Sequence, residues 1–257
     1  MDKYAIGVDI GSRTAKAVLL KDGEISAHRV ISTGWKPAEA AKLILKEIKA
    51  FPDLAEGDNV PIFSTGYGRD TVKDRTRSVT EITCHARGAK YLFPEVATVI
   101  DIGGQDAKVI SIDPSGLVMD FAMNDRCAAG TGRFLEFMAL SMNVSIEEFA
   151  RMGVGSDNPA QISSMCTVFA ESEMISLISS GSREPDVVAG LHRAIARRIA
   201  SMAEQVGCRE PVLFAGGVAN NPAVLEALRD TLGMELHVVG DPVLNGALGA
   251  ALLAAGE

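Results

Sequence analysis

Apolar and polar positions follow the same order of strand-like and helix-like periods in both halves of the chain. In the first half, apolar runs predict three strands and the helical spacing of apolar residues behind Pro37 predicts a helix. A short strand follows, and then a glycine-rich turn leads into a second, polar helix, which ends before Pro94. The expected ranges are strands over residues 4–10, 15–20, 24–31 and 60–64, the turn over 65–69, and helices over 38–50 and 80–89.

The second half restarts with three strands and then differs by a longer helical stretch. We expect strands over 98–102, 107–112, 117–122, 212–215 and 236–239, and helices over 132–142, 146–152, 166–179, 186–206, 222–232 and 245–255. Three strands, a helix, a strand and a helix is the order of a ribonuclease-H-like unit. The pattern therefore predicts an α/β fold of two ribonuclease-H-like domains. We place them at residues 1–94 plus 243–257 and at 95–242, with the final helix returning to the first domain.

A repeated turn is the strongest internal signal. Residues 8–18 align without a gap with residues 100–110, so that Asp9 and Asp101, Gly11 and Gly103, and a later lysine fall at one offset. Glycine lets backbone N–H groups approach an anion, and an aspartate at a strand end can hold a hydrated Mg²⁺. Two such turns facing each other would grip a polyphosphate. The alternative is a pair of structural hairpins in duplicated domains.

Composition narrows the range of functions. The 257 residues carry a net charge of −8 and only 5% aromatic residues, which argues against nucleic acid as the main partner. No apolar run approaches the roughly 18–20 residues that span a bilayer, and no signal peptide is recognised, so we expect a soluble, cytoplasmic protein without membrane association. The four cysteines contain no C-x-x-C pair, which excludes a disulfide framework in a cytosolic chain.

A late loop of small residues completes a set of three motifs. Residues 214–220, Phe-Ala-Gly-Gly-Val-Ala-Asn, open a helix whose exposed N–H groups would favour negative charge. With the two repeated turns, this order of motifs resembles the acetate and sugar kinase/Hsp70/actin superfamily. That resemblance implies ATP in a cleft between the two domains, with the adenosine against Gly216, Gly217, Val218, Ala219 and Asn220.

Two further segments narrow the resemblance. Residues 124–134 (Asn-Asp-Arg-Cys-Ala-Ala-Gly-Thr-Gly-Arg-Phe) and 163–173 (Ser-Ser-Met-Cys-Thr-Val-Phe-Ala-Glu-Ser-Glu) resemble the ATP-dependent activators of 2-hydroxyacyl-CoA dehydratases. That family of BadF/BadG/BcrA/BcrD-type ATPases includes the ATPase subunits of benzoyl-CoA reductase. Residues 66–69, 81–88 and 245–251 also match its patterns. The similarity covers essentially the whole chain.

The resemblance implies a homodimer with one [4Fe–4S] cluster between the subunits, held by Cys127 and Cys166 of each. Four thiolates suit a cubane cluster, and two per chain meet that need across a twofold axis. We expect each of these cysteines to lie directly before a helix, whose N-terminus would stabilise a thiolate. Cys84 and Cys208 are expected to be buried small hydrophobes. An arrangement of all four cysteines around one cluster in one chain is the less favoured alternative.

The resemblance thus implies an ATPase that drives one-electron transfer from the cluster to a partner metalloenzyme. The acceptor would be an acyl-CoA dehydratase or aryl-CoA reductase, and the donor a ferredoxin or flavodoxin. A sugar or small-molecule kinase of the same fold and a non-catalytic nucleotide-switched scaffold are the alternatives. His85 is assigned either an interface or interdomain role or that of a satisfied helix histidine. The expected catalytic residues are Asp9, Asp101 and Gln105, and the expected ATP/Mg²⁺ contacts, besides residues 216–220, are Gly11, Ser12, Arg13, Thr14, Ala15, Lys16, Gly103, Gly104, Gln105, Gly130, Thr131 and Gly132.

Overall fold

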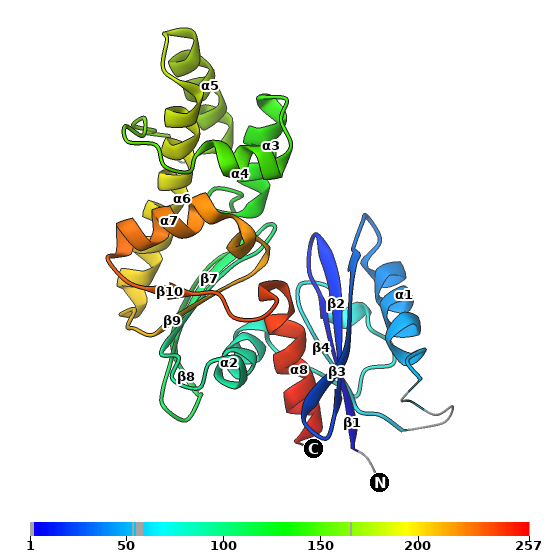
Figure 1. Cartoon of the computed structure of the whole chain (residues 1–257). Helices are drawn as coiled ribbons and strands as arrows, with labels where there is room; N and C mark the ends of the chain where they lie inside the picture. The colour runs from blue at the N-terminus through cyan, green and yellow to red at the C-terminus, as the bar shows by residue number, and fades with distance from the viewer. Residues whose placement is uncertain (1–2, 53, 55–58, 165, 257) are drawn as a thin grey trace. The chain divides into compact units, whose positions relative to one another are not determined.

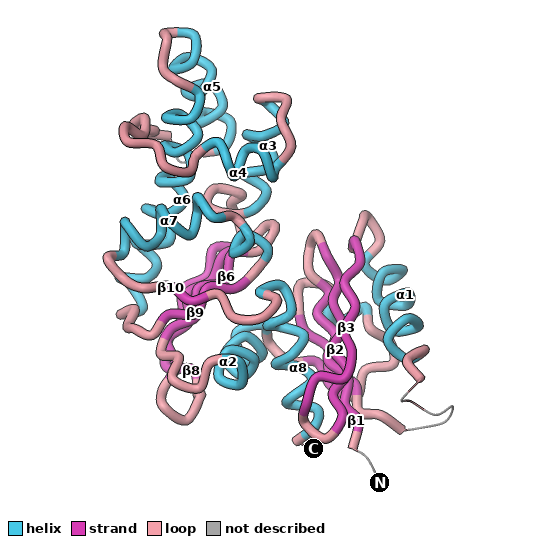
Figure 2. The backbone as a smooth tube through the Cα atoms, in the orientation of Figure 1, coloured by secondary structure: helices cyan, strands magenta, loops and turns pink. Residues whose placement is uncertain are grey.

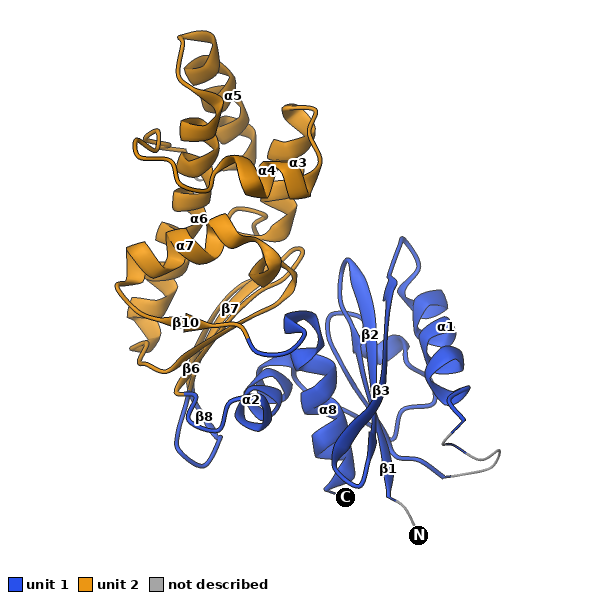
Figure 3. Ribbon diagram, in the orientation of Figure 1, with its two compact units in different colours: residues 1–96, 112–119, 239–257 blue, residues 97–111, 120–238 orange. Residues whose placement is uncertain are grey.

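A computed structural model describes residues 3–52, 54, 59–164 and 166–256. The chain forms two compact units (Figure 3). Unit 1 comprises residues 1–96, 112–119 and 239–257, and unit 2 comprises residues 97–111 and 120–238. The predicted domain ends at residues 1 and 257, and Met165 of the second cysteine segment, lie outside the described residues.

Unit 1 contains a five-stranded sheet in the order β3-β2-β1-β4-β5 (Figure 1). Strand β1 is antiparallel to β2 and parallel to β4. The second helix predicted for this half is confirmed as α2. A single 3₁₀ turn and the edge strand β5 precede it, and both are too short to leave a pattern in the sequence. The elements are β1 Tyr4–Ile10, β2 Thr14–Lys21, β3 Glu24–Ser32, α1 Pro37–Lys49, β4 Ile62–Thr65, η1 Arg69–Thr71, β5 Arg77–Ser78, α2 Glu81–Leu92, η3 Pro242–Leu244 and α8 Asn245–Ala255.

Helices cover both faces of this sheet. The apolar side of α1 packs on Ile6, Val8 and Ile10, while α8 lies on the opposite face beside α2 (Figure 2). The approach of α8 is close: a Cβ at Gly7 would lie 2.0 Å from a carbonyl oxygen of α8, and one at Gly249 would lie 1.8 Å from a carbonyl oxygen of α2. The apolar helix α8 is therefore core. No helix in the described part of the chain has the length and apolar character of a membrane span.

Unit 2 repeats the same topology. Its sheet has the order β10-β9-β6-β7-β8, in which β6 is antiparallel to β7 and parallel to β9, as β1 is to β2 and β4. The prediction of two ribonuclease-H-like sheets is confirmed. The elements are β6 Thr98–Ile102, β7 Ala107–Ile112, β8 Val118–Asn124, α3 Gly132–Ser141, α4 Ile146–Met152, α5 Thr167–Ser179, α6 Glu184–Val206, β9 Val212–Ala215, η2 Gly217–Asn220, α7 Pro222–Leu232 and β10 Leu236–His237.

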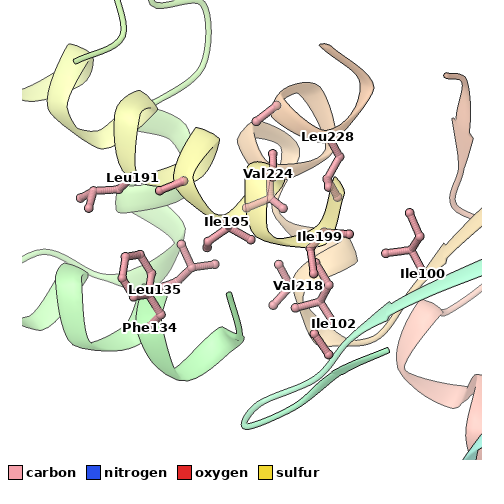
Figure 4. Packing of buried hydrophobic residues seen from close by; sticks show 14 of the residues in the cluster. Ile100, Ile102, Phe134, Leu135, Leu191, Ile195, Ile199, Val218, Val224 and Leu228 are labelled. Atoms are coloured by element: carbon pink, nitrogen blue, oxygen red, sulfur yellow. The ribbon is translucent and has the colours of Figure 1, made fainter. Parts of the chain in front are cut away.

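Of the additional helices of unit 2, α4 and α5 pack on α6, and α3 packs on α4 and α5 (Figure 1). Phe134 and Leu135 of α3 lie beside Leu191 and Ile195 of α6 in one apolar cluster, which continues to Ile102 at the end of β6 (Figure 4). The helices that lie between the two candidate cluster cysteines are therefore packed into the core of unit 2, whereas both cysteines are exposed.

Candidate nucleotide site and cysteine segments

The β1–β2 turn of unit 1 is built around a carboxylate and a lysine. Asp9 and Lys16 are cross-strand neighbours, and Lys16 Nζ donates to Asp9 Oδ2 at 3.1 Å. The Gly11 N–H donates to the Thr14 carbonyl oxygen at 3.1 Å. Thr33, the residue after β3, stabilises this turn, because its Oγ1 donates to the Gly11 carbonyl oxygen at 2.8 Å. Thr33 was not predicted, because nothing in its local sequence marks this tertiary contact.

The β6–β7 turn of unit 2 repeats the pair and adds a second carboxylate. Asp101 and Lys108 are cross-strand neighbours, with Nζ 3.4 Å from Asp101 Oδ2, and Lys108 is only 2% exposed. Its ammonium also pairs with Asp106. Carboxylate oxygens are the ligands that Mg²⁺ takes in proteins, so the two aspartates of this turn are both candidates to hold that ion. Asp106 escaped prediction because the repeat breaks there: its counterpart in unit 1 is Thr14. The predicted Gln105 lies exposed in this turn.

The similarity of the two halves extends to the parallel neighbours of the aspartate strands, because a glycine directly follows both β4, the neighbour of β1, and β9, the neighbour of β6. In register, Asp9 lies opposite Thr65 and Asp101 opposite Ala215, and the next residue in each case is a glycine at positive φ. A Cβ at Gly66 would lie 2.3 Å from Asp9 Oδ1, and one at Gly216 would lie 2.9 Å from Asp101 Oδ1. Each aspartate therefore needs a bare Cα beside it.

The predicted adenosine loop adjoins the second turn. A Cβ at Gly216 would lie 2.3 Å from the Ile102 carbonyl oxygen, whereas one at Gly217 would meet nothing within 4 Å. Packing therefore requires the first glycine only, and the second leaves backbone that a planar base can approach. The expectation of open helical N–H groups here is wrong: residues 217–220 form η2, and the Asn221 side chain caps α7 by accepting from two backbone N–H groups.

Cys127 lies in the loop between β8 and α3. The prediction that it directly precedes a helix is wrong, because residues 128–131 intervene before α3 begins. The buried Asn124 shapes this loop: its Nδ2 donates to the carbonyl oxygens of Cys127 and Ala129, both at 3.0 Å. Gly130 follows at φ +81°, a conformation that favours glycine.

The end of this loop is hydrogen-bonded to the second phosphate turn. The N–H groups of Gly132 and Arg133, at the start of α3, donate to the carbonyl oxygens of Gly103 and Gly104 at 2.9 and 2.8 Å. A helix start leaves its first N–H groups without helical partners, and here the turn supplies them. Thr131, fully buried, closes the loop by donating from Oγ1 to the Ala128 carbonyl oxygen at 2.7 Å. The turn and the Cys127 loop are therefore one hydrogen-bonded structure.

Cys166 is the N-cap residue of α5, as predicted. The chain before it is held by Glu173, whose carboxylate accepts from the Ser163 N–H at 2.9 Å, the Ser163 hydroxyl at 2.8 Å and the Ser164 N–H at 2.9 Å. Burial opposes ionisation of Glu173, but these hydrogen bonds outweigh it and lower the pKa of the carboxyl. Arg197 of α6 fixes the same segment by donating to the Ile162 carbonyl oxygen at 2.8 Å.

The four cysteines divide into two kinds. Cys127 and Cys166 are exposed, and both lie in unit 2. Burial raises the pKa of the Cys84 thiol to about 12, and burial also raises the pKa of Cys208, which is half-buried with Sγ 3.8 Å from Met234 Sδ. A cluster ligand is a thiolate, so Cys84 and Cys208 are poor ligands. The prediction that Cys84 is buried is confirmed.

Across the described residues, no group of three or more His, Cys, Asp or Glu side chains is arranged to hold a metal ion. Two exposed thiols, one of them at a helix start, supply half of the four ligands that a [4Fe–4S] cluster takes. The donor set therefore fits a cluster that two copies of the chain share.

Fold and turns together define an α/β protein of the actin-like ATPase class. The chain belongs to the BadF/BadG/BcrA/BcrD ATPase family, whose model matches residues 6–254. It is 43% identical to the 2-hydroxyisocaproyl-CoA dehydratase activator of Clostridioides difficile over 99% of this chain and 96% of the relative. It is also 43% identical to the (R)-2-hydroxyglutaryl-CoA dehydratase activating ATPase of Acidaminococcus fermentans, over 99% and 98%. A solved structure of the C. difficile activator with bound ADPNP superimposes with a TM-score of 0.91 at 42% identity, covering 98% of this chain and 94% of that one.

Proposed function

We propose that this protein is an ATP-hydrolysing activator that delivers single low-potential electrons to a partner metalloenzyme of the 2-hydroxyacyl-CoA dehydratase or aryl-CoA reductase type. Membership of an ATPase family and 43% identity to two dehydratase activators support this assignment. A ferredoxin or flavodoxin is the proposed electron donor.

Residues of both turns act on the nucleotide in this proposal. Asp9 and Asp101 position Mg²⁺ and the attacking water, and Gln105, exposed in its turn, contacts the terminal phosphate or that water. Backbone N–H groups of residues 11–16 and 103–105 bind the phosphates, and residues 216–220 hold the adenosine. Phosphoryl transfer depends mainly on positioning and charge stabilisation, which such groups supply.

Cys127 and Cys166 from each of two copies would hold one [4Fe–4S] cluster, which supplies a one-electron carrier. Asn124 and Glu173 fix the backbone beside the two cysteines by hydrogen bonds at 2.8–3.0 Å. A homodimer follows from this ligand count, because two thiols per chain complete the site only in pairs.

The observation that carries the proposal is the pair of hydrogen bonds from Gly132 and Arg133 to Gly103 and Gly104. A phosphate that displaces the turn must also displace the start of α3, which ends the Cys127 loop. Gly130, Thr131 and Gly132 would thus transmit the state of the nucleotide to the cluster ligand. A kinase of the same fold requires no connection of this kind.

The test replaces Asp101 by Asn and compares it with Asp120→Asn, an exposed aspartate of β8 in the same unit. We expect D101N to bind a fluorescent ATP analogue but to release phosphate at least about 100-fold more slowly, and to lose ATP-dependent reduction of a one-electron acceptor dye. D120N should behave as wild type. Normal turnover in D101N would remove the proposed role of Asp101, and transfer of phosphate to a sugar rather than to water would favour the kinase.

A further inference from the structure

Asn221 joins the predicted adenosine loop, residues 216–220, to helix α7. Its backbone N–H donates to the Val218 carbonyl oxygen at 2.9 Å and closes η2. Its side-chain Oδ1 accepts from the N–H groups of Ala223 and Val224 at 3.0 and 3.1 Å. Val218 and Val224 also belong to the apolar cluster that packs on α6 (Figure 4). The position of Asn221 therefore sets where the loop ends and where α7 begins.

One buried side chain of α6 reaches the amide of Asn221. His192 is 1% exposed, and its Nε2 lies 3.3 Å from Asn221 Nδ2. Because Oδ1 already accepts from two backbone N–H groups, the end of the amide that faces the ring is the NH₂, which only donates. Nε2 must then accept, and in the neutral imidazole the proton lies on Nδ1. Burial lowers the pKa of His192 to about 4, so the ring is neutral at neutral pH.

The opposite edge of the ring allows this tautomer. His192 Nδ1 has no hydrogen-bond partner among the described residues, and a Cβ at Gly153 would lie only 2.6 Å from it, so this edge faces a bare Cα. A cavity of about 30 Å³ borders both residues and Ser156, which is room for a water molecule that can accept from Nδ1–H. Phe149 packs edge-on against the ring at 5.2 Å between centroids and helps to orient it.

We propose that His192 is a positioning residue for nucleotide binding, which accepts a hydrogen bond from Asn221 and so holds the loop over residues 216–220 in the conformation that receives adenosine. The inference rests on the proposed function and adds to it a residue that does not itself contact the nucleotide. Without this acceptor the buried amide of Asn221 loses a hydrogen bond, and the loop is correctly placed for only part of the time. The apparent dissociation constant then rises in inverse proportion to that fraction. The loss affects the adenosine and leaves the phosphate contacts of the β6–β7 turn intact.

The experiment measures binding of a non-hydrolysable ATP analogue, ADP and inorganic triphosphate, each with Mg²⁺, to wild type and three variants. His192→Leu removes both ring nitrogens, and His192→Gln keeps an acceptor oxygen. Val188→Ala is the matched control, because Val188 is fully buried one turn earlier on the same helix and its loss weakens packing alone.

We expect H192L to weaken binding of the ATP analogue and of ADP about tenfold each, and of inorganic triphosphate less than about twofold. H192Q should recover most of the loss, and V188A should bind all three ligands as wild type does. In steady-state ATP hydrolysis, H192L should raise KM and leave kcat nearly unchanged, because the adenosine is bound equally in the ground state and the transition state.

A further measurement does not depend on any variant folding. Nitrogen-15 NMR of the wild-type protein at neutral pH should show His192 protonated on Nδ1 and unprotonated on Nε2. A proton on Nε2, wild-type nucleotide binding in H192L, equal weakening of triphosphate in H192L, or the same loss in V188A would each overturn the inference while leaving ATP binding intact. Failure of the wild type to bind either nucleotide would instead overturn the proposed function, and the inference with it.

Discussion

Replacing Glu173 by Gln isolates the contact that holds the Cys166 segment. The carboxylate accepts three hydrogen bonds, two of them from backbone N–H groups. In the amide, one of the two terminal atoms becomes an NH₂, so at least one backbone N–H of Ser163 or Ser164 faces a donor in either orientation. A hydrogen bond to a charged group is worth about 1.5–3 kcal/mol, and partial exposure brings the expected loss to about 1–2 kcal/mol.

This loss should appear as local opening of the segment before Cys166. A cost of about 1.4 kcal/mol raises the open population about tenfold, so amide hydrogen exchange of Ser163 and Ser164 should accelerate by about that factor. Loss of iron to a chelator should accelerate in parallel. Glu171→Gln, on the same helix, is the control, because Glu171 accepts from the Ser141 hydroxyl of α3 rather than from Ser163 or Ser164. Unchanged exchange and iron loss in E173Q would refute the assignment of Glu173 as the group that holds this segment.

Two further predictions concern stability. Gly249→Ala places a Cβ 1.8 Å from the Cys84 carbonyl oxygen, and overpacking of this kind costs about 3 kcal/mol or more of unfolding free energy. Urea denaturation should show that loss in G249A and almost none in the control Gly256→Ala, whose Cβ would meet nothing closer than 3.7 Å. Equal stability of the two variants would contradict the close packing of α8. Burial lowers the pKa of His192 to about 4. Between about pH 6.5 and about pH 4, therefore, His192 takes up a proton in the unfolded state only, and the free energy of unfolding should fall by up to about 3 kcal/mol over that range. Urea denaturation at a series of pH values should show that the free energy of unfolding depends less on pH in His192→Gln than in wild type, and equally in His28→Ala and wild type. The same pH dependence in H192Q as in wild type would show that another group causes the loss of stability in acid.

The sequence contained enough to predict both sheets, because the repeat preserves side-chain alternation and spacing. The Asp9–Lys16 and Asp101–Lys108 pairs fall on facing positions of a hairpin, so one alignment predicts both the turns and their chemistry. The two-residue strand β5 carries no such pattern and was missed. The equivalence of Gly66 and Gly216 was also missed, since it appears only when β4 and β9 are placed in register with the aspartate strands.

Hydrogen bonds between backbone groups that are distant in the chain could not be predicted from the sequence, for a different reason. Gly132 donates to Gly103 through main-chain atoms that every residue shares, so no side-chain pattern marks the bond. The expected helix directly after Cys127 begins only at Gly132, because Asn124 and Gly130 shape the four intervening residues into a turn. Asn221 lies between the predicted loop and the predicted helix over 222–232 and was assigned no role, yet its side chain caps the N-terminus of α7.

The most direct test of the shared cluster is iron and acid-labile sulfide per chain on protein purified without oxygen, measured together with its mass in solution. The ligand count predicts a dimer with about four irons and four sulfides per two chains. Cys127→Ser and Cys166→Ser should each lose the cluster, and Cys208→Ser should keep it. About eight irons per two chains would place a cluster inside each chain, and an iron-free monomer would contradict the electron-transfer function altogether.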